Sequence, residues 1–380
     1  MPSFLEFFAG GGMVRAGLAG GWTCLLANDI DAAKAAAYTD NWGAAVLKLG
    51  DIATLTTADV PGQADLAWGS FPCQDLSLAG AKAGLAGGRS GTFYPFWRLM
   101  TALMAEGRGP RLIALENVCG TLTSHGGRDF DAIGRAFAVA GYQWGALVID
   151  ASLFTPQSRP RLFLIGARGD LTIDPDRVGD GPSAPFHPPP LQSAVRALSP
   201  IARARLVWWR IAPPPPRIRT FADLIEEAPT DVAWHDQGQT ARLLDLMSPV
   251  NIAKVEAARR QNRRRVGAVY RRTRPTSDGG RTQRAEVRFD DIAGCLRTPA
   301  GGSSRQTILV VDGPLVRSRL ISARETARLM GLPDSYRLPK GYTDAYHLTG
   351  DGVVAPVVRH LASDLFEPLL GEAPTSRAAR

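Results

Sequence analysis

The sequence is poor in lysine and has no long, uninterrupted apolar run. Lysine occurs only at positions 34, 48, 82, 254 and 340, although lysine and arginine together number 44 among 380 residues. No apolar stretch reaches the roughly 18 residues of a membrane span. The start, MPSFLEFFAGGGM, lacks the basic residues and long apolar core of a secretory signal. We therefore expect a soluble, cytoplasmic protein without a membrane partner.

Cysteine is also scarce. The four cysteines form no C-x-x-C pair, and no histidines are spaced to complete a zinc site with them. Isolated cysteines in an intracellular chain indicate reduced thiols, so we expect no disulfides and no metal. The four are Cys24, Cys73, Cys119 and Cys295, and at most one or two of them need a chemical role.

The positive charge is therefore almost entirely arginine, and it exceeds the negative charge by eight. Arginine binds phosphate groups through two parallel hydrogen bonds, which favours a polyanionic partner such as nucleic acid. A biased base composition of the genome explains the same excess equally well. Charge alone does not decide between these two readings.

Residues 1–168 repeat a short apolar run, a turn with glycine or aspartate, and a helical stretch. This alternation predicts an α/β fold, a doubly wound and mostly parallel sheet with helices on both faces. Ligands of such sheets bind at the carboxyl ends of the strands. The expected strands are Phe4–Phe8, Thr23–Ala27, Ala45–Leu49, Asp65–Trp68, Leu112–Leu115, Ala146–Ile149 and Leu162–Ile165.

Composition divides the chain further. The α/β part is expected over 1–180, and the segment 181–216 holds ten of the 28 prolines, which indicates a linker or an extended surface segment. A second, smaller and basic domain is expected over 217–316. Helices are expected over 317–368, with Ser322 and Glu325 as a capping box, and a disordered tail over 369–380.

The second domain contains a strongly basic stretch, residues 253–274, with nine basic residues and one acid. Its first half has helical spacing, and like charges on one helix repel unless anions offset them. A solvated helical face is the simpler reading, but the imbalance favours contact with nucleic acid. The candidates for this contact are Arg263, Arg264, Arg265, Arg271 and Arg272.

A glycine-rich stretch, FFAGGGMVRAGL, joins the first expected strand to a helix. Glycines allow a ligand to approach the backbone, although a tight turn without a ligand is an equal alternative. Aspartates follow the next two strands, at Asp29 and Asp31 after one and at Asp51 after the other. Each could simply cap a helix, but together with the glycines they favour a cofactor that contains a nucleoside.

Two further strands end in reactive groups. One leads into GSFPCQDLSLAG, where Pro72 fixes the backbone before Cys73 and a loop rich in small residues follows. A random cysteine is more often a small buried side chain, but this context fits a nucleophile beside a lid. The other strand ends in Glu116, a carboxylate that needs a partner or a function at that depth. In TPQSRPRLFLIG, Arg159 and Arg161 are two positions apart at the start of an apolar strand, so their side chains are expected on the same face.

These motifs, in this order, resemble those of the DNA cytosine-5 methyltransferases. The likeness covers F-x-G-x-G, P-C-Q, E-N-V and Q-x-R-x-R within 1–168, and ISARETARLMGLPDSY in the C-terminal part. It implies an S-adenosylmethionine-dependent methyltransferase sheet, with the basic middle region as the target-recognition domain. It also implies that the C-terminal helices over 317–368 pack back on the catalytic domain. It also implies a double-stranded DNA partner and a monomer that is encoded by a bacterium or phage and associates with the bacterial nucleoid. A modification system of this kind can include a cognate restriction endonuclease that acts separately.

The resemblance assigns roles by position. Cys73 would be the nucleophile that adds to C6 of a flipped-out cytosine, and Glu116 the acid at N3. Arg159 would hold O2, and with Arg161 it would order the active site. The substrate would also be contacted by Gln74, Asn117 and Gln157. The S-adenosyl-L-methionine site would comprise Phe8, Gly10, Gly11, Gly12, Asp29, Ile30, Asp51, Ile52, Pro72 and Asp351.

Two positions depart from the family pattern. Asp351, in YHLTGDGVVAPVV, stands where the family has asparagine, which predicts an altered affinity for the cofactor. Cys119 follows E-N-V and is expected to be a buried structural thiol. Two other functions stay open: a tRNA cytosine-5 methyltransferase, since such enzymes share these motifs, and a catalytically silent DNA-binding protein. The long basic middle region favours DNA, and the intact reactive residues argue against a silent protein.

Overall fold

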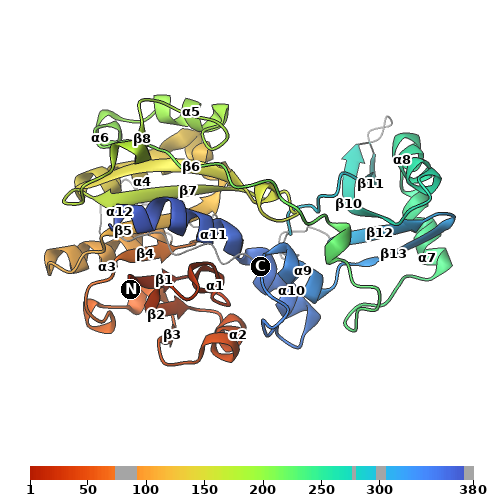
Figure 1. The fold of residues 1–380 in the computed structure, drawn as a ribbon, viewed down its shortest axis with the longest axis horizontal. Helices are drawn as coiled ribbons and strands as arrows, with labels where there is room; N and C mark the ends of the chain where they lie inside the picture. Colours follow the sequence, from red (N-terminus) through yellow and green to blue (C-terminus); the bar gives the residue numbers. More distant parts are fainter. Residues whose placement is uncertain (73–91, 276–279, 297–304, 372–380) are drawn as a thin grey trace. The chain divides into compact units, whose positions relative to one another are not determined.

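The computed structural model describes residues 1–72, 92–275, 280–296 and 305–371 (Figure 1). The chain divides into two compact units, and the second is inserted into the first. Unit 1 comprises Met1–Asp150, Pro160–Pro215 and Val353–Arg380, and unit 2 comprises Ala151–Arg159 and Pro216–Gly352. The chain therefore passes from one unit to the other at four points.

Unit 1 is built on a seven-stranded sheet with the order β3-β2-β1-β4-β5-β7-β6. The first five strands are parallel, and β7 is antiparallel to both of its neighbours. This confirms the predicted α/β fold with a mostly parallel sheet. The strands are β1 (Ser3–Phe7), β2 (Thr23–Asp29), β3 (Leu47–Leu49), β4 (Leu66–Gly69), β5 (Leu112–Val118), β6 (Tyr142–Asp150) and β7 (Pro160–Arg168).

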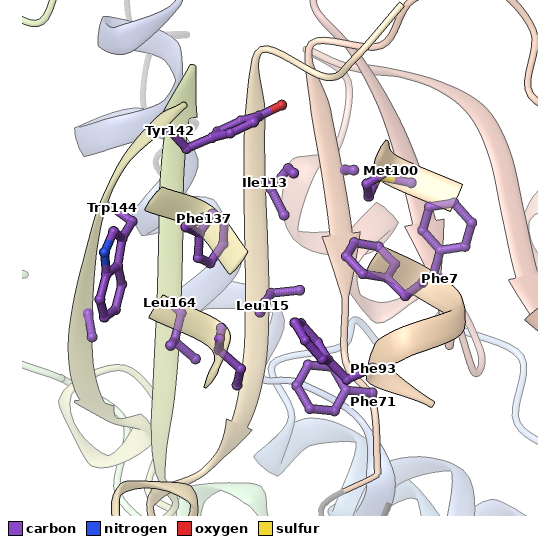
Figure 2. Packing of buried hydrophobic residues seen from close by; sticks show 14 of the residues in the cluster. Phe7, Phe71, Phe93, Met100, Ile113, Leu115, Phe137, Tyr142, Trp144 and Leu164 are labelled. Atoms are coloured by element: carbon purple, nitrogen blue, oxygen red, sulfur yellow. The ribbon is translucent and has the colours of Figure 1, made fainter. Parts of the chain in front are cut away.

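The core of unit 1 lies where helices cover the sheet, and it is rich in aromatic rings. Phe7 of β1 meets Phe96 edge to face with ring centroids 5.3 Å apart, a favoured arrangement of aromatic pairs. Figure 2 shows Phe71 and Phe93 together beside Leu115 of β5. The helices that follow the first strands are α1 (Met13–Leu18), α2 (Ala32–Trp42), α3 (Phe93–Ala105) and α4 (Arg128–Val139).

The strand order reverses at β1, which lies between β2 and β4. In doubly wound sheets the crevice for a ligand opens outside the carboxyl ends of the strands at this point. The glycine-rich loop follows β1, and the segment that leads to Cys73 follows β4. The fold thus brings the two motifs to the same edge of the sheet.

The C-terminal helices complete unit 1. They are α11 (Ala355–Leu361), a π-helical turn (Ala362–Phe366) and α12 (Glu367–Leu369). Of the helical region predicted over 317–368, only the part from Val353 belongs to unit 1, and the part up to Gly352 belongs to unit 2. Helix α11 packs on α1 so closely that a Cβ on Gly17 would lie 2.5 Å from the Val358 Cβ. The Trp22 indole donates a hydrogen bond of 3.0 Å to the Glu367 carboxylate. The two ends of the described chain are therefore packed into one core.

The proline-rich segment 181–216 differs from the predicted linker, because most of it folds onto unit 1. It contains the short helices α5 (Pro189–Arg196) and α6 (Pro200–Arg203), and β9 (Trp208–Trp209) pairs with β8 (Val178–Gly179). Each helix has proline in its first turn, where a missing N–H costs nothing. Prolines thus start short helices here, and Trp209 anchors the segment through a 2.9 Å bond to the Ile165 carbonyl.

Unit 2 has a four-stranded antiparallel sheet with the order β11-β10-β12-β13. One face packs against α8 and α7 through an apolar cluster that includes Val255, Val269 and Val287. The predicted capping box is confirmed, because Ser322 and Glu325 exchange side-chain-to-backbone hydrogen bonds at the start of α9. The elements are α7 (Gln237–Asp245), α8 (Pro249–Arg260), β10 (Arg265–Pro275), β11 (Arg281–Arg288), β12 (Thr307–Asp312), β13 (Leu315–Leu320), α9 (Ala323–Leu329) and α10 (Tyr342–Asp351).

Candidate active site

The glycine-rich loop between β1 and α1 has an unusual backbone. Phe8, Gly10 and Gly12 all adopt left-handed conformations, with φ of 58°, 55° and 76°. Such a conformation is strained for phenylalanine, and strain of this kind concentrates at functional sites. A Cβ built on Gly10 would meet no atom within 4 Å, so there is open space beside the loop's first glycine.

Asp29, at the end of β2, holds this loop from one side. Its carboxylate accepts the Gly10 N–H at 2.7 Å and the Asp31 N–H at 2.8 Å. The next side chain, Ile30, is 68% exposed, which is unusual for a large apolar residue at the end of a buried strand. The polar and apolar groups expected around a nucleoside therefore lie together at this edge.

The second predicted pair is arranged differently. The Asp51 side chain accepts the Ala53 N–H at 2.9 Å and caps a short 3₁₀ helix (Ile52–Thr54). Ile52 is buried and belongs to the core cluster of unit 1. Asp51 is exposed, so its carboxylate can contact a ligand, whereas the buried Ile52 side chain anchors this segment to the core.

Glu6 is a functional candidate that the sequence reasoning missed. It lies in the middle of β1, is fully buried, and accepts the Val14 N–H at the start of α1 at 3.2 Å. Burial raises the pKa of Glu6 to about 8, and the backbone hydrogen bonds from Val14 and Arg15 only partly offset this. A single acid inside the apolar run FLEFF was the available signal.

The segment after β4 is tied to the end of β5. The Asn117 side chain donates to the Phe71 carbonyl at 3.0 Å and accepts the Val118 N–H at 2.8 Å. Phe71 is buried and Pro72 is exposed, so the chain emerges from the core immediately before Cys73. Cys73 and Gln74 themselves lie outside the described residues. Asn117, predicted to contact substrate, fixes here the backbone that leads to the cysteine.

Glu116 and Arg161 form an ion pair on neighbouring strands. The Arg161 Nε lies 3.2 Å from the Glu116 Oε1, and both side chains are largely shielded from solvent. Since Glu116 is only 6% exposed, the arginine supplies the partner that a carboxylate at this depth requires. Glu116 also neighbours Asn117, which places the pair beside the segment that leads to Cys73.

Arg159 has a different environment from Arg161. Its side chain is 2% exposed and is enclosed by other residues of unit 2. One terminal nitrogen donates to the Gly350 and Gly352 carbonyls at 2.7 and 2.8 Å. The other contacts the Leu296 carbonyl at 3.2 Å and the Cys295 sulfur at 3.3 Å. All four terminal N–H groups of Arg159 are thereby engaged within unit 2.

Gln157 is also enclosed in unit 2. It is fully buried, donates to the Leu329 carbonyl at 3.1 Å, and accepts the Leu296 N–H at 3.3 Å. Asp351, by contrast, is exposed at the last position of α10, between the two glycines that Arg159 holds. Of these residues only Asp351 presents its side chain to solvent.

The arginines nominated for nucleic-acid contact fall into two groups. Arg264 forms an ion pair of 2.9 Å with Glu227, and Arg265 bonds to the Phe289 carbonyl. These two stabilise unit 2 itself. Arg263, which contacts Gln261, and both Arg271 and Arg272 of β10 are exposed.

The hairpin of β10 and β11 adds arginines that the sequence reasoning did not nominate. Arg272 lies directly opposite Arg284 in the ladder, and both are exposed. Like charges in this position destabilise a sheet unless a counter-charge is present. Glu286 offers one at 3.6 Å from Arg272, while no ion pair of Arg284 is found among the described residues. Such a surface is suited to binding an anion.

The described part of the chain offers neither a membrane-spanning helix nor a cluster of metal ligands. No helix there is long and apolar enough to cross a membrane. No group of three or more histidine, cysteine, aspartate or glutamate side chains there could hold a metal ion.

Residues 2–367 match the family model of the C-5 cytosine-specific DNA methylases. The chain belongs to this family. The match spans both units and includes every motif that suggested the resemblance, which confirms the prediction of a cytosine-5 DNA methyltransferase at the level of the family.

Curated relatives agree with this assignment. The chain is 26% identical to the type II methyltransferase M.NlaX of Neisseria lactamica, over 96% of each chain. It is 25% identical to M.BsuFI of Bacillus subtilis, over 97% of this chain and 73% of the relative. Both are named as type II methyltransferases.

Solved structures share the fold. The S. pombe Dnmt2 methyltransferase superimposes with a TM-score of 0.57 at 18% identity, covering 97% of this chain and 99% of the other. A DNA modification methyltransferase encoded in an Escherichia coli prophage gives 0.56 at 17% identity, covering 98% and 100%. At these identities the likeness establishes the methyltransferase fold.

Proposed function

We propose that this methylase transfers a methyl group from S-adenosyl-L-methionine to C5 of cytosine within a specific duplex DNA sequence. The target base is flipped out of the duplex, because C5 and C6 are not accessible to the enzyme inside the stack. The observation that carries the proposal is the buried ion pair of Glu116 and Arg161. It lies beside Asn117, which holds the segment leading to Cys73.

The edge of the sheet at β1 and β2 fits the cofactor. The open space at Gly10, the Asp29 carboxylate and the exposed Ile30 side chain together offer room, a hydroxyl acceptor and an apolar contact. S-adenosyl-L-methionine, when bound, supplies an electrophilic methyl group on a sulfonium. Within unit 1, the proposed cofactor residues are Phe8, Gly10, Gly11, Gly12, Asp29, Ile30, Asp51 and Pro72, and Ile52 packs in the core beside Asp51. A cofactor role of Asp351, in unit 2, stays a prediction from the family pattern.

Cys73 and Glu116 would activate the base together. The Cys73 thiolate adds to C6 and forms a sulfur–carbon bond, and the displaced electron pair makes C5 nucleophilic. Glu116 donates a hydrogen bond at N3, where the addition builds negative charge. C5 would gain the methyl group as the methyl–sulfonium bond breaks and leaves a neutral thioether. C5 then loses its proton to a base, and the bond between C6 and the Cys73 sulfur breaks to release the thiolate.

Arg161 would orient Glu116 and contact the O2 side of the base. We favour Arg161 over Arg159 for this contact, because the terminal N–H groups of Arg159 already bind Cys295 and three carbonyls of unit 2. Arg159 would instead anchor the backbone on both sides of Asp351.

The hairpin of unit 2 would hold DNA. Arg272 and Arg284 lie opposite each other, and Glu286 offers a single negative charge to this pair, so two phosphate groups would balance the two arginines better. Arg271 adds a further positive charge on β10. Contacts to phosphates position a protein on DNA, and contacts to base edges specify the sequence. We therefore propose that Arg272 and Arg284 contact phosphates and position the protein on DNA.

The experiment that tests the function uses the purified protein, S-adenosyl-L-methionine and unmethylated plasmid DNA. Mass spectrometry of the digested nucleosides should find 5-methylcytosine with the parent and none with Cys73→Ala. Bisulfite sequencing of the same DNA then gives the target site. Product on tRNA but not on DNA would replace the DNA substrate by RNA. No product on either, with a folded protein, would refute the transferase activity.

A further inference from the structure

The carbonyl of Gly11 has a partner that comes from another part of unit 1. The indole Nε1 of Trp42, the last residue of α2, donates a hydrogen bond of 3.0 Å to it. Trp42 lies at the far end of α2, the helix that follows β2. Trp42 belongs to none of the family motifs and to none of the proposed catalytic, cofactor-binding or DNA-binding residues.

The loop needs such a restraint because of its composition. Three consecutive glycines leave the peptide units around Gly11 free to rotate, and only their hydrogen bonds select one orientation. The Gly10 N–H is fixed by Asp29, and the Gly12 N–H by the Ala9 carbonyl at 2.8 Å. Trp42 fixes the Gly11 carbonyl that lies between them.

Trp42 is itself held in place. The guanidinium of Arg15 lies 5.3 Å from the centre of its ring, a cation–π contact, and donates to the Tyr38 hydroxyl at 2.9 Å. A Cβ on Gly12 would lie 2.4 Å from the Trp42 Nε1 and 2.9 Å from a Tyr38 ring carbon. The absence of a side chain at Gly12 therefore allows Trp42 and Tyr38 to pack directly under the loop.

We propose that Trp42 is a positioning residue, which holds the glycine loop in its ligand-binding shape before the cofactor arrives. A loop that is already ordered loses less entropy on binding, so the affinity for the cofactor rises. This inference rests on the proposed function, since it takes S-adenosyl-L-methionine as the ligand of the loop.

The test is Trp42→Phe, which keeps an aromatic ring over Arg15 and removes the N–H donor. The Kd and KM for S-adenosyl-L-methionine should rise by about three- to tenfold, the usual effect of one hydrogen bond. The kcat at saturating cofactor and the Kd for DNA should stay at the parent's values. In the ligand-free protein, hydrogen–deuterium exchange of peptides that cover residues 9–14 should become faster.

Trp144→Phe is the matched control. The Trp144 indole also donates to a carbonyl, that of Ala202 at 2.8 Å, but within the core of unit 1. This variant should be less stable, with unchanged cofactor affinity. Unchanged exchange and cofactor affinity in Trp42→Phe would overturn the inference, as would an equal loss of cofactor binding, DNA binding and kcat. A parent that binds no S-adenosyl-L-methionine would instead refute the proposed function.

Discussion

Arg161 and Glu116 lie diagonally across two antiparallel strands, with the Arg161 Nε 3.2 Å from the Glu116 Oε1. The ladder pairs Arg161 with Val118, two residues beyond Glu116, so both side chains project from one face of the sheet. The antiparallel direction of β7 creates this relationship, because it brings the beginning of β7 to the end of β5. The antiparallel pairing of β5 with β7 thus places a cation and an acid together at a rim that otherwise consists of parallel strands.

Glu116→Gln should reduce the rate of methylation by roughly 10²- to 10⁴-fold, because glutamine lacks the acidic proton that the carboxyl group offers at N3. Single-turnover kinetics with saturating cofactor and DNA would measure this. The Kd for DNA should change little. Glu106→Gln, an exposed carboxylate at the end of α3 that pairs with Arg108, is the control and should behave as the parent. A fully active Glu116→Gln would exclude Glu116 as the acid.

Arg159→Met should destabilise the protein by about 3 kcal/mol or more, since each orphaned buried carbonyl costs about 1–3 kcal/mol. Three carbonyls, of Leu296, Gly350 and Gly352, lose their donor in this variant. Urea denaturation would measure the loss, and the exposed Arg263→Met would serve as control. If Arg159→Met were as stable as the parent but could not form the covalent adduct with DNA, Arg159 would be a base contact after all.

Arg272→Ala and Arg284→Ala should each weaken DNA binding by a similar factor for all sequences. Each should also lower the slope of log K against log salt by about 1, as expected for one lost phosphate contact. Titrations at several salt concentrations would show this. Arg196→Ala, on α5 of unit 1, should leave the slope unchanged. A change in the methylated sequence, at an unchanged slope, would mean that these arginines read bases.

Glu6→Gln should make the stability less dependent on pH. Burial raises the pKa of Glu6 from 4.5 to about 8 in the folded protein, so the folded state binds a proton that the unfolded state has released. The parent therefore loses stability as the pH rises from about 4.5 to about 8, on the order of 1 kcal/mol per pH unit. Urea denaturation at pH 5 and pH 8 should show a smaller loss for Glu6→Gln. An equal loss in both proteins would mean that Glu6 is ionised in the fold.

Much of the fold could be predicted because local patterns and tertiary structure agree there. The buried strands of unit 1 have continuous apolar runs, and Ser322 with Glu325 forms a capping box that needs only local bonds. The proline-rich segment was harder to interpret. Prolines exclude the interior of a helix but favour its first turn, so the same residues fit a linker or a series of short helices.

The sequence predicts site residues well where a motif lies at the end of a strand. It predicts poorly which side chains contact one another, because those contacts depend on how the strands pair. Glu116 and Arg161 are 45 positions apart in sequence, and only the antiparallel register of β7 joins them. The spacing of Arg159 and Arg161 suggested one shared role. Instead, the first arginine belongs to unit 2 and the second to unit 1, because the chain crosses between the units at Pro160.

The packing of α11 on α1 bears on the order in which the protein folds during synthesis. Gly17 and Val358 meet in one contact, yet 340 residues separate them, and all of unit 2 is translated in between. Unit 2 is a continuous segment apart from residues 151–159, so it can fold while the ribosome is still adding residues. The α1 surface of unit 1 stays uncovered until α11 emerges. A nascent chain paused before α11 therefore exposes the apolar residues of α1 that α11 covers, and unit 1 is complete only after unit 2 has been made.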